Sequence, residues 1–280
     1  MTAGDSTTGY HGMTDIHCHL LPGIDDGPRN WEQSVELCRA MADDGITRAV
    51  ATPHLIDGVY NNTLSLVTPL TAQLNARLGD AGIKLEVLTG AEVDLASRYA
   101  QGSPELPTLA GGKAVLLEMP MAVLPQAMDQ VLFSVTSQDL VPVLAHPERN
   151  EPLQDNPRLA ADWLRAGAVL QVDGDSLLGV WGRGAERLAI KLLERGLAQA
   201  MASDAHSVKR RPPRLAEARQ RAAELVGEQA AALLTNSGPQ ELLASRVLAV
   251  PVYSANAEHD SDASAVPGKA SGWLGRLFGR

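Results

Sequence analysis

The sequence TDIHCH, over residues 14–19, ends a short apolar run with two histidines. Residues two apart on an extended strand face the same side, so His17 and His19 can bind one ion together. Cys18 then points away from that ion, and we expect it to be a small buried residue rather than a ligand. The same pattern, an apolar run closed by a histidine or an acidic residue, recurs along the chain.

Seven such runs predict seven strands, over residues 14–17, 47–52, 85–93, 114–118, 141–145, 168–172 and 198–202. Helical spacing of apolar residues predicts helices over residues 31–44, 64–78, 160–166, 184–195, 214–226, 228–234 and 239–244. Strands that alternate with helices are typical of parallel βα units. Nearly continuous apolar strands indicate burial on both faces, as in a parallel barrel or sheet.

Polar residues with metal-binding side chains follow or close six of these strands. They are His17, His19, His54, Glu92, Glu118, His146, Asp204 and His206. The carboxyl ends of parallel strands are where α/β folds bind ligands. A single histidine in such a place is more often a structural residue than a ligand. Many imidazoles and carboxylates at one edge, however, need a positive partner, and divalent metals meet that need.

Composition excludes several other classes of protein. The chain has 280 residues, 45% of them hydrophobic, and a net charge of −9. An acidic chain does not attract nucleic acid through its overall field, so we expect no nucleic-acid partner unless a local basic patch supplies one. Phosphate chemistry here would need metals or a few placed arginines.

Two cysteines, Cys18 and Cys38, make no disulfide framework and favour a reducing compartment, which predicts a cytoplasmic protein. The sequence contains no run of 18 apolar residues, so it predicts no membrane span. We expect residues 1–13 to form a flexible leader, residues 14–253 one domain, and residues 254–280 a flexible tail.

Several motifs in order identify a family resemblance: HxH, an Asp-Asp-Gly-Pro turn, TPH, GAE, LLEMP, AHPERN and SDAHS. This set resembles the polymerase and histidinol phosphatase (PHP) superfamily over about residues 14–245. It is most similar to the bacterial protein-tyrosine phosphatases that accompany capsule and exopolysaccharide synthesis. The resemblance implies a distorted TIM-like (β/α)7 barrel. It also implies two or three divalent metal ions, with manganese expected and iron or zinc as alternatives.

The resemblance implies a metal-ligand set of His17, His19, Asp26, His54, Glu92, Glu118, His146, Asp204 and His206. We expect His17, His19 and Asp204 on one ion and Asp26, His54 and His206 on another. Glu92 is expected to bridge ions, His146 to serve a third site, and Glu118 to be a ligand or an outer partner. Arg149 and Arg211 match positions that handle phosphate, a task that suits the planar guanidinium. Lys209 and Arg210 remain alternatives to Arg211.

The implied activity is that of a phosphoric monoester hydrolase that removes phosphate from tyrosine. The implied substrate is the tail of a membrane tyrosine autokinase that governs polysaccharide export. Hydroxide generated by the metals would attack phosphorus directly. A cysteine nucleophile requires an arginine six residues later, whereas Ile24 and Asp44 stand at that distance from Cys18 and Cys38.

Two alternatives stay open on sequence. One is another phosphoesterase of the superfamily, such as a histidinol-phosphate phosphatase. The other is a non-catalytic metal-binding scaffold, which the open set of His, Asp and Glu ligands disfavours. Asp173 and Asp175 are interpreted as a turn and helix start, and Glu148 as either an outer partner or a surface charge.

Overall fold

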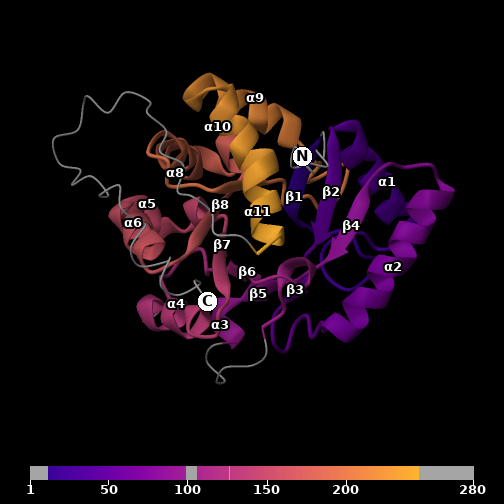
Figure 1. Ribbon diagram of the computed structural model, residues 1–280, viewed down its shortest axis with the longest axis horizontal. Coiled ribbons are helices and arrows are strands. Elements are labelled where there is room, and N and C mark those ends of the chain that lie inside the picture. The colour runs from indigo at the N-terminus through magenta and orange to yellow at the C-terminus, as the bar shows by residue number, and fades with distance from the viewer. Residues whose placement is uncertain (1–11, 99–105, 126, 246–280) are drawn as a thin grey trace, which may run out of the picture.

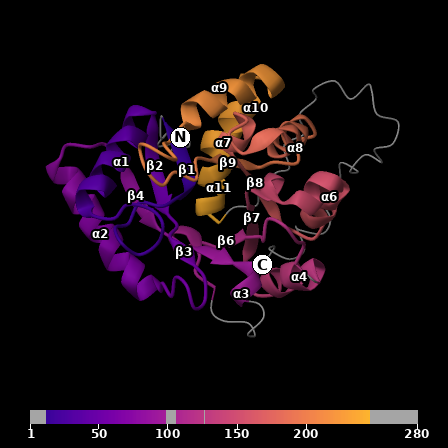
Figure 2. The same ribbon diagram turned by 180° about the vertical axis from the view of Figure 1, so that it is seen from behind.

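The computed structural model describes residues 12–98, 106–125 and 127–245, and shows an α/β fold whose strand pairs are all parallel (Figures 1 and 2). Its strands are β1 (Met13–Cys18), β2 (Ile46–Ala51), β3 (His54–Leu55), β4 (Glu86–Thr89), β5 (Glu92–Asp94), β6 (Ala114–Glu118), β7 (Val141–Ala145), β8 (Val169–Asp173) and β9 (Ala200–Ala202). One sheet has the order β1-β2-β4, and the other has the order β3-β5-β6-β7-β8-β9. Parallel pairing leaves the carboxyl ends of the strands at a common edge.

The helices fill the connections between strands and the end of the described chain. They are α1 (Trp31–Asp43), α2 (Leu64–Asp80), α3 (Leu95–Arg98), α4 (Met128–Thr136), α5 (Glu151–Asp155), α6 (Arg158–Arg165), α7 (Gly174–Leu177), α8 (Gly182–Glu194), α9 (Leu215–Val226), α10 (Glu228–Ala232) and α11 (Gly238–Leu243). Short 3₁₀ helices are η2 (Leu109–Gly111) and η3 (Pro147–Arg149), and η4 (Leu233–Ser237) is a π-helix. Helices α1 and α2 flank the first sheet, while α4, α5 and α6 lie at the opposite end of the molecule (Figure 1).

One predicted strand was wrong: residues 85–93 form two strands, β4 and β5, which belong to different sheets. The break falls at Gly90, where an added Cβ would lie 2.7 Å from Val50 Cγ1. Only a residue without a side chain fits so close a backbone approach. The two-residue strand β3 was not predicted either, because it follows β2 after only Thr52 and Pro53.

Helical spacing also missed the short helices α3 and α5 and the nine-residue α4. Helices of four or five residues are too short to show a periodic apolar face. The predicted first strand starts one residue late, since β1 begins at Met13. Residues 1–11 of the predicted leader and the predicted tail, residues 254–280, lie outside the described residues.

Buried apolar side chains form two clusters. The larger one fills the space between strands and helices and includes Leu37, Leu132 and Leu193. The smaller one gathers side chains from β1, β2, β6, β7, β8 and β9, for example Ile16, and includes Leu242 of α11. Strands buried on both faces match the nearly continuous apolar runs of the sequence.

No helix within the described residues combines the length and apolar character that crossing a bilayer requires.

Candidate metal centre

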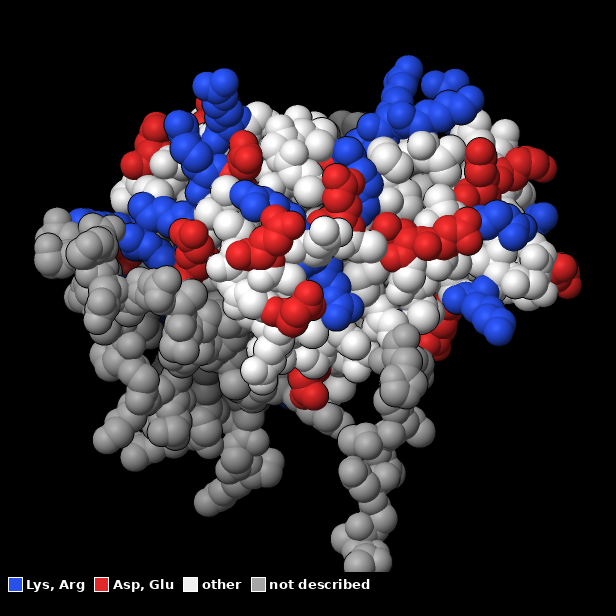
Figure 3. Space-filling model, turned by 90° about the horizontal axis from the view of Figure 1, so that it is seen from above, with Lys and Arg blue, Asp and Glu red and all other residues white. Residues whose placement is uncertain are grey.

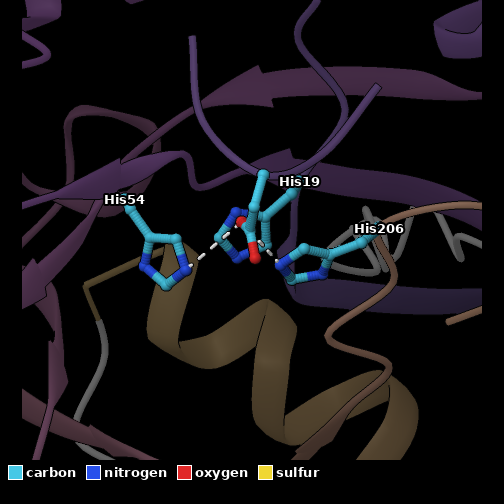
Figure 4. Close-up of side chains that lie close together, drawn as sticks. His19, His54 and His206 are labelled. Atoms are coloured by element: carbon cyan, nitrogen blue, oxygen red, sulfur yellow. Dashed lines mark ion pairs between the residues drawn. The ribbon is translucent and has the colours of Figure 1, made fainter. Parts of the chain in front are cut away.

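The nine predicted metal ligands all come together where the strands end. Four overlapping groups have ligand atoms within 4.8 Å of one another. They are His19, Asp26, His54 and His206; His17, His146 and Asp204; His17, His19 and Glu92; and His54, Glu92 and Glu118. Figure 4 shows His19, which follows β1, facing His54 of β3 and His206, which follows β9.

The groups overlap, so the predicted division of the ligands among separate ions stays a prediction. His19 lies with Asp26, His54 and His206 as well as beside His17. His146 shares a group with His17 and Asp204 rather than standing apart. A strand alternation places side chains on one face, but it does not say which of two neighbouring ions each side chain reaches.

Glu92 lies at the centre of the cluster and is fully buried. Its Oε1 is 3.2 Å from both His17 Nε2 and His146 Nε2. Its Oε2 is 2.9 Å from His54 Nδ1 and 3.4 Å from His19 Nε2. A carboxylate with two oxygens turned toward different imidazoles has the geometry of a bridging ligand.

The backbone turns sharply at two of the ligands. His146 and Asp204 have φ angles of 32° and 49°, in the left-handed region that residues other than glycine rarely adopt. His146 directly follows β7, Asp204 lies two residues after the end of β9, and each side chain lies in the cluster. Such conformations cost about 1–3 kcal/mol each and are concentrated at functional sites.

Outer partners orient three of the imidazoles. His17 Nδ1 lies 2.9 Å from Gln171 Oε1, and His19 Nδ1 lies 2.8 Å from Asp25 Oδ2. His206 Nδ1 lies 2.8 Å from the carbonyl oxygen of Asp204. In each case Nδ1–H donates to oxygen. Nε2 of His17 and of His19 thereby keeps its lone pair for a metal, whereas His206 Nε2 lies 2.9 Å from Arg211 Nη1. The sequence patterns do not indicate Gln171 or Asp25 as partners, although Asp25 is adjacent to Asp26.

We therefore expect Asp25→Asn to weaken metal binding by about 10- to 100-fold, the usual effect of removing such an outer partner. The change removes the negative charge next to His19 Nδ1 and keeps the side-chain volume. Calorimetric titration of metal-free protein with Mn²⁺ measures the affinity. Asp80→Asn, an exposed carboxylate at the end of α2, is the matched control. Equal affinities for both variants would contradict this role.

Asp204 connects the cluster to the two predicted arginines. Its Oδ1 faces His17 Nε2 at 3.4 Å and His19 Nε2 at 3.5 Å. Its Oδ2 accepts hydrogen bonds from Arg149 Nη1 at 2.9 Å and from Arg211 Nη2. Within the basic run over residues 209–211, the side chain of Arg211 reaches the cluster, whereas those of Lys209 and Arg210 are exposed. Both arginines therefore border the predicted metal ligands.

The chemistry of the cluster fits divalent cations. His17 Nε2, His19 Nε2, His54 Nδ1 and Glu92 Oε2 are buried, and none makes a hydrogen bond within the described residues. Leaving buried polar atoms without partners costs about 1–3 kcal/mol each. Imidazole nitrogens and carboxylate oxygens that converge without hydrogen bonds are the donor set that Mn²⁺, Fe²⁺ or Zn²⁺ would satisfy.

The charges of the cluster support the same conclusion. Burial acts to lower the pKa of His17, but the Glu92 and Asp204 carboxylates outweigh it and raise the pKa to about 9. Burial and the positive charge of Arg149 lower the pKa of His146 to about 4, which keeps this imidazole neutral as a ligand must be. Burial and the Glu92 carboxylate raise the pKa of Glu118 to about 7. The carboxylates thus require positive charge among them, and cations supply it.

Three further acidic residues, Asp173, Asp175 and Glu148, lie in the interior near this cluster. Asp173 and Asp175 begin α7, as interpreted from the sequence, and Asp173 Oδ1 accepts a hydrogen bond from the Asp175 N–H. Glu148 is fully buried, and its Oε1 accepts a hydrogen bond from the Asp173 N–H at 3.0 Å. It is an interior partner and not a surface charge.

Acidic and basic side chains are interspersed on the face seen in Figure 3. With a net charge of −9, the chain as a whole repels phosphate. An anionic substrate would therefore depend on local positive charge, which the arginines and the predicted cations provide.

Comparisons with known proteins show the family to which the chain belongs. The family described as capsular polysaccharide synthesis, CpsB/CapC, matches residues 13–244. Tyrosine-protein phosphatase YwqE of Bacillus subtilis is 37% identical over 201 residues, which cover 71% of this chain and 79% of the relative. Tyrosine-protein phosphatase CpsB of Streptococcus pneumoniae is 25% identical over 243 residues, which cover 84% and 100%.

Solved structures give the same picture. A chain from the crystal structures of YwqE from Bacillus subtilis and CpsB from Streptococcus pneumoniae superimposes with a TM-score of 0.78 and 33% identity. The match covers 87% of this chain and 100% of that one, and those proteins are described as metal-dependent tyrosine phosphatases. A lactonase from Listeria monocytogenes, with a TM-score of 0.51, 12% identity and coverage of 83% and 94%, shares the fold alone.

Proposed function

The chain belongs to the CpsB/CapC family of capsular polysaccharide synthesis, and from that premise we propose that it is a metal-dependent protein-tyrosine phosphatase. The observation that carries the proposal is the position of Arg149 and Arg211 on Asp204, directly beside nine clustered metal-ligand candidates. Phosphate ester hydrolysis needs cationic groups of both kinds around the equatorial oxygens.

We propose that His17, His19, Asp26, His54, Glu92, Glu118, His146, Asp204 and His206 hold two or three divalent ions, with manganese expected. Bound ions of this kind neutralise phosphate charge and acidify water. Asp25 and Gln171 orient two of the imidazoles, and Arg149 and Arg211 bind the phosphoryl oxygens. The tyrosyl leaving group has a pKa of about 10, so its departure needs little protonation.

The barrel predicted from the sequence belongs to this proposal. We infer that the two sheets form one distorted barrel of seven βα units. Support comes from β3 and β5, which follow β2 and β4 after short breaks, and from a parallel bridge between Cys18 and Ala205. Further support comes from the second apolar cluster, whose side chains come from six of the strands. The match to residues 13–244 supports treating residues 14–253 as a single domain.

The proposed substrate is a tyrosine-phosphorylated protein of capsule synthesis, and specifically the tail of a membrane tyrosine autokinase. Support for the protein substrate comes from the tyrosine-protein phosphatases that match this chain, and the kinase tail rests on the family resemblance alone. We also propose a cytoplasmic location. Cys18 and Cys38 are both free and buried, which suits a reducing compartment.

The test is to strip the protein of metal and refill it separately with Mn²⁺, Fe²⁺, Zn²⁺ or Mg²⁺. We expect no turnover of a phosphotyrosine peptide by the stripped protein and full recovery with at least one of these ions, manganese first. Histidinol phosphate serves as the comparison substrate. Preferential turnover of histidinol phosphate would contradict the proposed substrate, and tight metal binding without hydrolysis of either compound would contradict catalysis.

A further inference from the structure

The indole of Trp181 contacts both predicted phosphate-binding arginines. Trp181 belongs to the short loop between α7 and α8 and is partly buried. Gly182 follows it with φ at 88°, a backbone conformation that strongly favours glycine and that starts α8 at this point. The family motifs that point to the metal site do not include Trp181.

Both arginines lie over the indole ring of Trp181. The Arg149 Cζ is 4.2 Å from the ring centroid, and the Arg211 Cζ is 5.3 Å from it. Arg149 ends η3 after β7, whereas Arg211 lies in the loop after β9. Two cations from separate elements repel each other, and the negative face of one indole attracts both.

This contact differs in kind from the others that the arginines make. Asp204 Oδ2 accepts hydrogen bonds from Arg149 and Arg211 and so occupies N–H donors. The indole attracts a guanidinium through its π face and uses none of those donors. A phosphoryl group, which needs several N–H donors in the guanidinium plane, can bind while the contact with Trp181 persists.

Trp181 is itself held in place. Its Nε1–H donates a hydrogen bond of 2.7 Å to Asp173 Oδ2. Asp173 is buried, and its backbone N–H donates to Glu148 Oε1 at 3.0 Å. Glu148 precedes Arg149 directly in η3. The indole is therefore connected through buried groups to the element that carries one of its two arginines.

We propose that Trp181 is a positioning residue that holds Arg149 and Arg211 side by side for the phosphoryl group of the substrate. The proposal rests on the proposed phosphatase function. It assigns Trp181 no contact with the metal ligands, so its loss should affect phosphate binding and leave metal binding intact.

The test compares Trp181→Leu with Trp181→Phe in Mn²⁺-loaded, full-length protein. Binding of inorganic phosphate is measured by calorimetry, and KM and kcat are measured with p-nitrophenyl phosphate. We expect Trp181→Leu to weaken phosphate binding about 10-fold, the size expected for two cation–π contacts, with unchanged metal content. Trp181→Phe keeps an aromatic face and should recover most of that loss.

Trp31→Leu is the matched control, because Trp31 also lies under an arginine, with Arg77 Cζ at 4.5 Å, on α1 and α2. We expect this change to leave phosphate binding unaltered. When Arg149 is already replaced by alanine, Trp181→Leu should weaken phosphate binding less than it does in the natural chain.

Phosphate binding within twofold of the natural protein in Trp181→Leu would overturn the proposal, as would an equal loss in Trp181→Phe. A drop in bound metal would overturn it too, since the effect would then be structural. Binding of phosphate can be measured without turnover. A protein that binds phosphate but does not hydrolyse phosphotyrosine would therefore contradict the proposed function, while the result for Trp181 would still stand.

Discussion

Glu92→Gln should lower turnover of a phosphotyrosine peptide by about 10³-fold, equivalent to a loss of several kcal/mol of metal-assisted stabilisation. Glu92 faces the imidazoles of His17, His19, His54 and His146 from a fully buried position. Glutamine has nearly the same volume but carries no charge, and its amide N–H₂ would face nitrogens that should be binding cations.

Metal content per chain and kcat, measured on the same sample, check this expectation. We expect at least one ion per chain to be lost. The control is Cys18→Ser, at a buried thiol that donates to the Val50 carbonyl and that we expect to play no part in the chemistry. Normal metal content and turnover in Glu92→Gln would contradict the bridging role. Loss of turnover in Cys18→Ser with metals still bound would instead indicate a thiol mechanism.

Arg149→Ala and Arg211→Ala should each lower kcat/KM by about 10- to 100-fold, because each removes hydrogen bonds from a charged donor worth about 1.5–3 kcal/mol. Both side chains already lie on Asp204 Oδ2, at the border of the metal ligands. Metal content should be retained in both variants, which separates their effect from that of Glu92→Gln.

Arg210→Ala is the matched control for Arg211→Ala, since it removes the same charge from an exposed neighbour. We expect kcat/KM to stay within about twofold for this variant. In the double variant Arg149→Ala, Arg211→Ala, kcat/KM should fall by less than the product of the two single fold-losses, because the two arginines act together on one phosphoryl group. An equal loss of kcat/KM in Arg210→Ala and Arg211→Ala would mean that overall positive charge, and not the position of the Arg211 guanidinium, determines substrate binding.

Much of the fold could be predicted because each buried strand is a visible apolar run. The predicted strand over residues 114–118 agrees with β6, and that over 141–145 agrees with β7. The prediction over 85–93 was wrong because a single apolar run does not reveal that β4 ends at Thr89 and that Gly90 then packs closely against Val50. That contact joins residues 40 positions apart in the chain.

The ligand set followed from sequence for a similar reason. A histidine or carboxylate that closes or follows a parallel strand lies at the same edge as every other such residue, so eight of the nine candidates need no coordinates. Asp26, in the loop between β1 and α1, came only from the family resemblance. Which of these side chains lie next to one another did need coordinates. His19 lies beside both His17 and His206, which its place on the strand does not indicate.

The outer partners were decided by tertiary structure alone. Gln171 lies 154 residues from His17 along the chain, and Trp181 lies 30 or more residues from both arginines it contacts. Nothing in the local pattern of TDIHCH or of the strand over residues 168–172 indicates these pairings. The sequence by itself determined that His17 and His19 share a face, because strand geometry is local. Only the packed structure decided what orients them and what steadies Arg149 and Arg211, because those contacts join strands and loops that are brought together by folding.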